Sequence, residues 1–115
     1  MADLDAESLD TVVTRGTDNV FADLGYPDAD ERQTKLRLAF AINEILTAQK
    51  FTQAVAAARL NVGQPKVSAL ANYKLDGFSV ERLMTFLTAL DQDIEIVIKT
   101  KSASRPTGRI VVVAA

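Results

Sequence analysis

Apolar residues recur every three or four positions along the centre of the chain, which is the spacing of one face of an α-helix. The first long run predicts a helix that begins near Asp28 or Asp30, either of which would cap it, and that ends near Gln49. The chain should therefore fold around a long first helix. The buried stripe of that helix is expected to consist of Leu38, Ala41, Ile42 and Ile45.

Two short helices joined by a tight turn are predicted next. Thr52 would cap the first of them, which covers residues 53–60. Asn61 would end it, because asparagine is one of the few residues that tolerate a left-handed backbone. The second short helix would cover residues 64–72, and Pro65 suits its first turn, where the backbone amide has no helical partner.

A fourth helix and then a different pattern complete the chain. Ser79 would cap a helix that ends near Leu90 and whose apolar side faces the core. Beyond it, residues 94–99 alternate between apolar and polar side chains, and residues 109–113 are rich in β-branched types. These runs predict a short C-terminal β strand or hairpin. An isolated hairpin is marginal in water, so the runs would pack on the helices or pair with a second chain.

These elements predict a mainly α fold, a bundle of four to five helices with a short C-terminal β strand or hairpin. Residues 1–20 lack strong periodicity and are expected to form an acidic flexible arm, with a short helix near residues 6–13. A helical domain would cover residues 21–92, and residues 93–115 would form a C-terminal β segment that could serve in dimerisation. The patch Phe21, Leu24 and Tyr26 is expected to pack on the first long helix.

Composition narrows the function classes. A chain of 115 residues with 48% apolar residues favours one domain with a modest core. It has no cysteine and no histidine, which excludes thiol and imidazole catalysis and zinc sites made of those residues. The five glycines are scattered, so no phosphate-cradling loop is expected. We therefore expect no enzyme, no cofactor and no metal site.

Location is predicted from the same composition. No apolar run reaches the roughly 18 residues of a membrane span. The N-terminus is acidic and lacks the basic and apolar regions of a signal peptide. A cytoplasmic protein without membrane contact is expected.

The net charge of −2 hides a division along the chain. Residues 1–31 carry nine acids and one base, which gives −8, whereas residues 32–115 carry twelve bases and six acids, which gives +6. One interpretation of the acidic segment is a solvated tail. The other is a segment that meets a basic partner, or that weakens nonspecific DNA contact by competing with it.

The two short central helices have the features of a helix-turn-helix. Two short helices that cross at a steep angle need a small residue where they touch, and Ala57 lies at that position with Ala56 beside it. Leu60, Val62, Val67 and Leu70 fall where the first helix, the turn and the second helix must bury side chains. Overpacking at Ala57 should distort the motif.

The residues from Thr52 to Leu70 resemble the XRE-type (Cro and phage-repressor-like) helix-turn-helix family. The longer stretch over residues 19–99 is more specifically similar to the HigA-type antitoxin subgroup. The resemblance implies a lambda-repressor-like fold and a sequence-specific DNA-binding transcriptional repressor, antitoxin-like and autoregulatory. Three positions depart from the family pattern: Asn61 replaces the usual turn glycine, Tyr73 stands where a glycine often ends the reading helix, and Val55 replaces a commonly polar residue.

The resemblance also implies DNA-contacting residues. In such proteins the second helix of the motif lies in the major groove and the first crosses the phosphate backbone. Glutamine suits adenine, lysine suits guanine acceptors and alanine suits a thymine methyl. A solvated surface role is the alternative for each polar position. The implied base contacts are Gln64, Lys66, Ser68 and Ala69, and the implied phosphate contacts are Gln53, Asn72 and Lys74.

Three kinds of partner follow from this interpretation. A palindromic double-stranded operator calls for a homodimer, because one reading helix contacts only a few base pairs. The C-terminal β runs are one candidate dimer surface, through their strand edges, and the fourth helix is another. HigA-type proteins bind a basic RelE-like (HigB-like) toxin, and the acidic arm would suit one. The alternatives are a stand-alone repressor with no toxin, and an interaction module that binds a basic partner through the arm.

Overall fold

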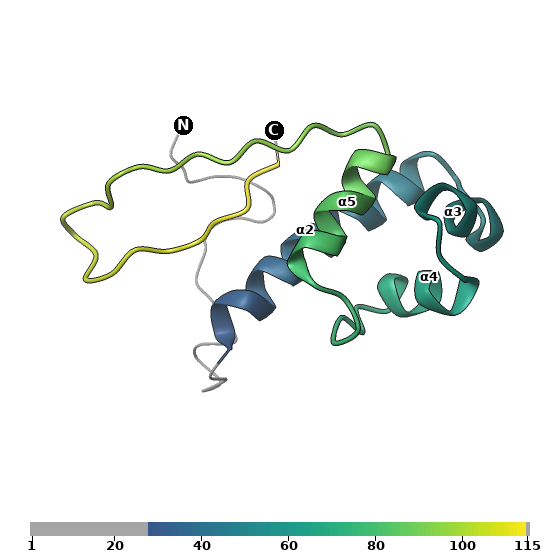
Figure 1. Cartoon of the computed structure of the whole chain (residues 1–115), viewed down its shortest axis with the longest axis horizontal. Helices are drawn as coiled ribbons and strands as arrows, with labels where there is room; N and C mark the ends of the chain where they lie inside the picture. The colour runs from purple at the N-terminus through teal and green to yellow at the C-terminus, as the bar shows by residue number, and fades with distance from the viewer. Residues whose placement is uncertain (1–27, 115) are drawn as a thin grey trace. The chain divides into compact units, whose positions relative to one another are not determined.

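The computed structural model describes residues 28–114 (Figure 1). Residues 35–108 make one compact unit, and the described residues of the second unit are 28–34 and 109–114. Four helices, α2 to α5, are present in the described part, which confirms a mainly helical fold. The expected helix near residues 6–13 and the packing of Phe21, Leu24 and Tyr26 lie outside the described residues.

The long helix α2 spans Ala29–Ala48, within one residue of its predicted bounds. Asp30 and Glu31 occupy its first turn, where negative charge complements the helix dipole. Along its centre, Leu38 and Ile42 are buried, as the predicted stripe requires. Ala41 and Ile45, the other predicted stripe members, are half-buried.

Helix α3 spans Gln53–Leu60, as predicted. The Thr52 hydroxyl accepts a hydrogen bond from the Val55 amide at 3.2 Å, which caps the helix at its N-terminus. Asn61 follows with φ 57° and ψ 47°, the left-handed conformation expected for the turn. The local signals of cap and turn therefore define this helix.

Helix α4 spans Gln64–Ala71, with Pro65 in its first turn. It ends one residue before the predicted bound because Asn72 leaves the helical conformation at φ −98° and ψ 11°. Val67 and Leu70 are buried on its inner side. Val67 and Leu70 are thus confirmed as core positions of the motif, whereas Val62, also predicted to be buried, is half-buried.

Helix α5 spans Val80–Ala89, and the Ser79 hydroxyl caps it by accepting from the Arg82 amide at 3.0 Å. Phe78, in the connection between α4 and α5, is buried. Its ring meets that of Phe86 edge to face, with centroids 5.9 Å apart and planes at 76°. The connection from α4 to α5 therefore contributes to the core. The buried apolar side of α5 consists of Leu83, Phe86 and Leu87.

The predicted C-terminal strand or hairpin is wrong for the described residues. Neither residues 93–108 nor residues 109–114 contain a strand. Ile96, Val97 and Ile98 are 74%, 78% and 92% exposed, so no helix covers this alternating run. A strand is stabilised by hydrogen bonds to a neighbouring strand, and the alternating pattern alone does not supply that neighbour.

Candidate nucleic-acid interface

Helices α3 and α4 pack against each other (Figure 1). Ala56 and Ala57, the small residues expected at this contact, are buried, and a methyl side chain lets backbones approach closely. The Val62 amide donates to the Ala57 carbonyl at 3.0 Å, which closes the turn between the helices. The motif therefore holds α4 at a fixed angle to α3.

A hydrogen bond from α2 fixes the end of α4. The Asn43 side-chain amide donates to the Leu70 carbonyl at 3.1 Å, and Asn43 is half-buried. This carbonyl lies in the last turn of α4, where helical partners run out. Sequence reasoning missed Asn43, whose only signal is an amide side chain directly beside the buried stripe of α2.

The structure places the sequence-predicted DNA residues on α4, on the start of α3 and on the connection after α4. Gln53 is the first residue of α3 and is exposed. Gln64 and Lys66 are exposed in the first turn of α4, whereas Ser68 and Ala69 are half-buried. Asn72 and Lys74, the predicted phosphate contacts at the other end of α4, are exposed.

Lys66 does not extend straight into solvent. Its ammonium group donates to the Gly77 carbonyl at 3.5 Å and lies 5.0 Å from the centroid of the Phe78 ring. A methyl group at Gly77 would lie 3.2 Å from this nitrogen, so glycine leaves room for the lysine. Lys66 therefore links α4 to the loop before α5. A contact to a base would replace the Gly77 and Phe78 contacts.

Asn72 has a structural role beside its predicted one. Its side-chain amide donates to the Ser68 carbonyl at 2.9 Å, a carbonyl in the last turn of α4 that also accepts the Asn72 backbone amide at 3.0 Å. An asparagine amide carries two donor hydrogens, so one donor serves the helix end. Its phosphate contact stays a prediction.

The segment that contains α3 and α4 differs in charge from the rest of the chain. Residues 45–75 contain no acid and four bases, Lys50, Arg59, Lys66 and Lys74. Arg59 is engaged within the protein, since it donates to the Ala89 carbonyl at 3.0 Å and lies 5.4 Å from the centroid of the Phe51 ring. An acid-free stretch around an exposed helix suits an anionic partner such as DNA. The absence of acids from residues 45–75 can be read from the sequence. Comparing the charge before and after residue 31 did not reveal it, because that comparison averages over residues 32–115.

Known proteins agree with this geometry. The chain matches the helix-turn-helix domain family over residues 20–99. A solved structure assigned as an XRE family transcriptional regulator is 67% identical, has a TM-score of 0.74, and is matched over 77% of this chain and 100% of that chain. This chain belongs to the XRE family. No curated protein matches it at a significant level.

Three positions at which this XRE-family chain departs from the expected pattern are exposed. Asn61 and Tyr73 both adopt the left-handed backbone, at φ 57° and φ 58°. Glycine is the usual residue in such a conformation because it has no Cβ atom. Val55 is 45% exposed on α3.

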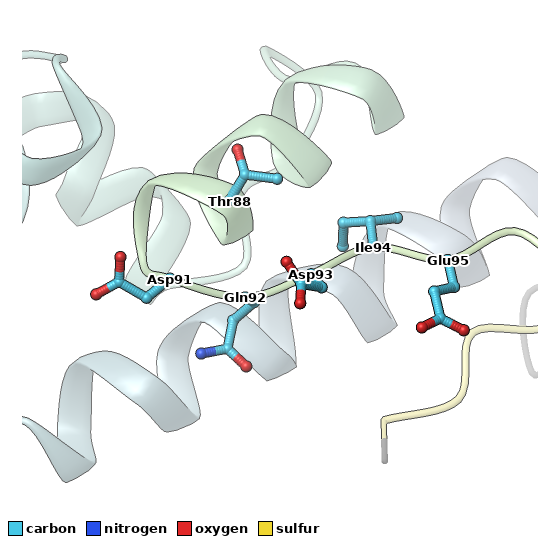
Figure 2. A pocket seen from close by; sticks show the side chains of 6 residues that line it. All are labelled: Thr88, Asp91, Gln92, Asp93, Ile94 and Glu95. Atoms are coloured by element: carbon cyan, nitrogen blue, oxygen red, sulfur yellow. The ribbon is translucent and has the colours of Figure 1, made fainter.

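The end of α5 offers a different surface of this XRE-family protein. A hollow there combines three carboxylates with polar and apolar side chains, and the carboxylates spread along the chain without converging (Figure 2). In the described part of the chain, no group of acidic residues is arranged to hold a metal ion. An acidic surface repels phosphate, which makes this region a poor DNA contact. The hollow is lined by Thr88, Asp91, Gln92, Asp93, Ile94 and Glu95.

Helix α2 is the longest helix of the described residues, at 20 residues. Neither α2 nor any other helix between residues 28 and 114 has the length and apolar character needed to cross a bilayer.

Proposed function

We propose that this XRE-family protein is a sequence-specific DNA-binding transcriptional repressor that inserts α4 into the major groove. The observation that carries the proposal is the packed α3–α4 pair, which exposes Gln64 and Lys66 within a stretch free of acids. Family membership supports it, as does the solved relative assigned as a transcriptional regulator. In helix-turn-helix proteins the second helix of the motif reads base edges.

The base contacts lie along α4. Gln64 pairs with adenine through its amide, and Lys66 donates to guanine acceptors after leaving Gly77. Ser68 and Ala69 are half-buried and contribute short-range contacts, the alanine methyl against a thymine methyl. Gln64 and Lys66 therefore carry most of the sequence discrimination in this proposal.

The phosphate contacts flank α4. Gln53, at the start of α3, donates to one phosphate, and the N-terminal end of the helix dipole favours that contact. Asn72 and Lys74 donate to phosphates beyond the C-terminal end of α4. These contacts set the position of the protein on the duplex and carry no sequence information themselves.

A homodimer on a palindromic operator completes the proposal. Two copies double the contact area, and the two-fold axis of the dimer matches that of the site. The exposed side chains of Ile96 and Ile98 offer apolar surface that a second copy would cover. Sedimentation velocity should give a dimer for the wild type and a monomer for an Ile96→Asp/Ile98→Asp variant. A monomeric wild type bound to a single half-site would contradict this part.

We further propose an antitoxin role, in which the acidic segment 1–31 binds a basic RelE-like toxin and the complex represses its own promoter. The charge of −8 on this segment supports it by complementarity. A stand-alone repressor is the second candidate. Co-expression with a small basic protein from a neighbouring open reading frame distinguishes the two candidates. A stable complex that is lost when residues 1–27 are deleted supports the antitoxin. The absence of a complex supports the stand-alone repressor.

Binding-site selection on random duplex DNA tests the central proposal. We expect an enriched palindrome whose half-sites are spaced about one helical turn, roughly 10–10.5 base pairs. Affinity for the selected site should fall with salt, and Lys74→Ala should lower the salt slope by about 1 while weakening all sequences alike. No enriched sequence, or no binding to duplex DNA at low salt, would overturn the proposed function.

A further inference from the structure

Tyr73 closes α4 in a conformation that tyrosine rarely adopts. Its φ is 58°, in the left-handed region. The Tyr73 amide donates to the Leu70 carbonyl at 3.1 Å, and the next amide, of Lys74, donates to the Ala69 carbonyl at 2.9 Å. This pair of bonds is a helix-ending motif whose left-handed position glycine usually occupies, because glycine has no Cβ atom to crowd the following carbonyl oxygen.

No hydrogen bond or ring contact of the Tyr73 side chain offsets this strain within the described residues. The residue is 39% exposed. Within residues 28–114, its hydroxyl has no hydrogen-bond partner and its ring no aromatic or cationic partner. A residue in a strained backbone conformation, with a partly exposed side chain and no polar partner, is the kind of outlier that points to function.

The other left-handed residues of the described part are of different types. They are Lys50, Asn61 and Asp91, all polar, and asparagine and aspartate tolerate this conformation best. Tyr73 is the aromatic member of the set. Like the others it comes just after a helix, but in its case the helix is α4, which ends at Ala71 and which we propose reads DNA.

We propose that Tyr73 is a DNA-contact residue that donates its hydroxyl hydrogen to a backbone phosphate and packs its ring against the adjoining deoxyribose. The inference rests on the proposed function. Its neighbours Asn72 and Lys74 are exposed, and the C-terminal end of a reading helix lies beside the DNA backbone. Tyrosine hydroxyls are among the groups that bind phosphate oxygens in protein–DNA complexes.

The test compares two substitutions at Tyr73 that should lower DNA affinity without lowering the melting temperature. Tyr73→Gly removes the strain and the side chain, so its melting temperature should rise by several degrees while its affinity falls by about tenfold, the size of a lost hydrogen bond to a charged group. Tyr73→Phe keeps the ring and the strain, so its melting temperature should equal that of the wild type while its affinity also falls. Because a phosphate contact is blind to sequence, both variants should weaken selected and scrambled duplexes alike.

Asn61→Gly is the matched control, since it places glycine at the other left-handed position of the motif without a change of charge. It should leave affinity unchanged. Full affinity in Tyr73→Gly, or a lower melting temperature together with lower affinity, would overturn the inference, because the tyrosine would then have no role or a folding role. If the wild type binds no duplex DNA, the proposed function itself is overturned. If the wild type binds and both Tyr73 variants bind with the same affinity, only the inference is overturned.

Discussion

The α3–α4 pair buries the apolar side chains on its inner side, whereas residues 93–108 leave theirs exposed. These residues follow α5, contain no helix or strand, and are called the extended residues. In the pair, Val67 and Leu70 are 3% and 1% exposed. In the extended residues, Ile96 and Ile98 are 74% and 92% exposed, although they are as apolar as the first two. Both regions carry a regular pattern of apolar positions, but only in the helical region do these side chains form part of the core.

The difference follows from where each element finds its hydrogen bonds. A helix satisfies its backbone within its own residues, so its apolar face needs only neighbours on which to pack. A strand satisfies its backbone through another strand, so its apolar face forms only when that partner is present. The alternating run at residues 94–99 therefore has the composition of a strand without the pairing of one.

The largest contrast should come from removing apolar bulk in each region. Leu70→Ala opens a cavity in the packed motif and should lower the free energy of unfolding by about 2–5 kcal/mol. Ile98→Ala is the matched control, and its effect should stay within roughly 0.5 kcal/mol because the side chain is already in water. Urea unfolding followed by circular dichroism measures both. Losses of equal size would show that residues 94–98 are packed in solution.

The second test adds bulk to the helix contact. Ala57→Leu should lower the free energy of unfolding by about 1–3 kcal/mol, because Ala57 is buried and a larger side chain would overpack its surroundings. Ala58→Leu adds the same bulk one residue later, at an exposed position, and should change stability by less than about 0.5 kcal/mol. If both variants melt like the wild type, the two helices do not meet at Ala57.

The third test removes the hydrogen bond from α2 to α4. Asn43→Ala should lower the free energy of unfolding by about 1 kcal/mol, because the Leu70 carbonyl loses a part-buried side-chain donor and keeps only backbone donors. Glu44→Ala, at the exposed neighbouring position, is the control. Hydrogen exchange at the end of α4 should rise in Asn43→Ala alone, and unchanged exchange would mean that the bond does not hold the helix end.

The smallest effect is expected at the boundary between the two regions. Arg59 and Asp91 approach to 3.5 Å, but the Asp91 side chain is 91% exposed. Exposed ion pairs contribute little, so Asp91→Asn should cost less than about 0.5 kcal/mol. A loss above that size, removed by high salt, would show that the ion pair anchors the start of the extended residues.

Local signals predicted the helices, and the structure bears this out. Thr52 and Ser79 cap α3 and α5 as expected, and Asn61 makes the left-handed turn. These features depend on residues three or four positions apart, which a sequence displays directly. Leu60, Val67 and Leu70 follow from the same periodicity.

Contacts between distant residues were not predictable in the same way. The Asn43 bond spans 27 positions, and the fold-back of Lys66 onto Gly77 spans 11. The burial of Phe78 depends on the Phe86 ring, eight positions later and on another element. Each depends on how helices meet in space, and no local pattern encodes that. The strand prediction failed for the same reason, because pairing is a property of two segments.

The central claim is that side chains of α4 discriminate between DNA sequences. The most direct measurement compares the affinity of wild type and Gln64→Ala for the selected operator and for a scrambled duplex of equal length and salt. The account predicts that Gln64→Ala loses about tenfold or more on the operator and nothing on the scrambled duplex. Equal affinity of the variant and the wild type for the operator, or equal losses on both duplexes, would contradict it.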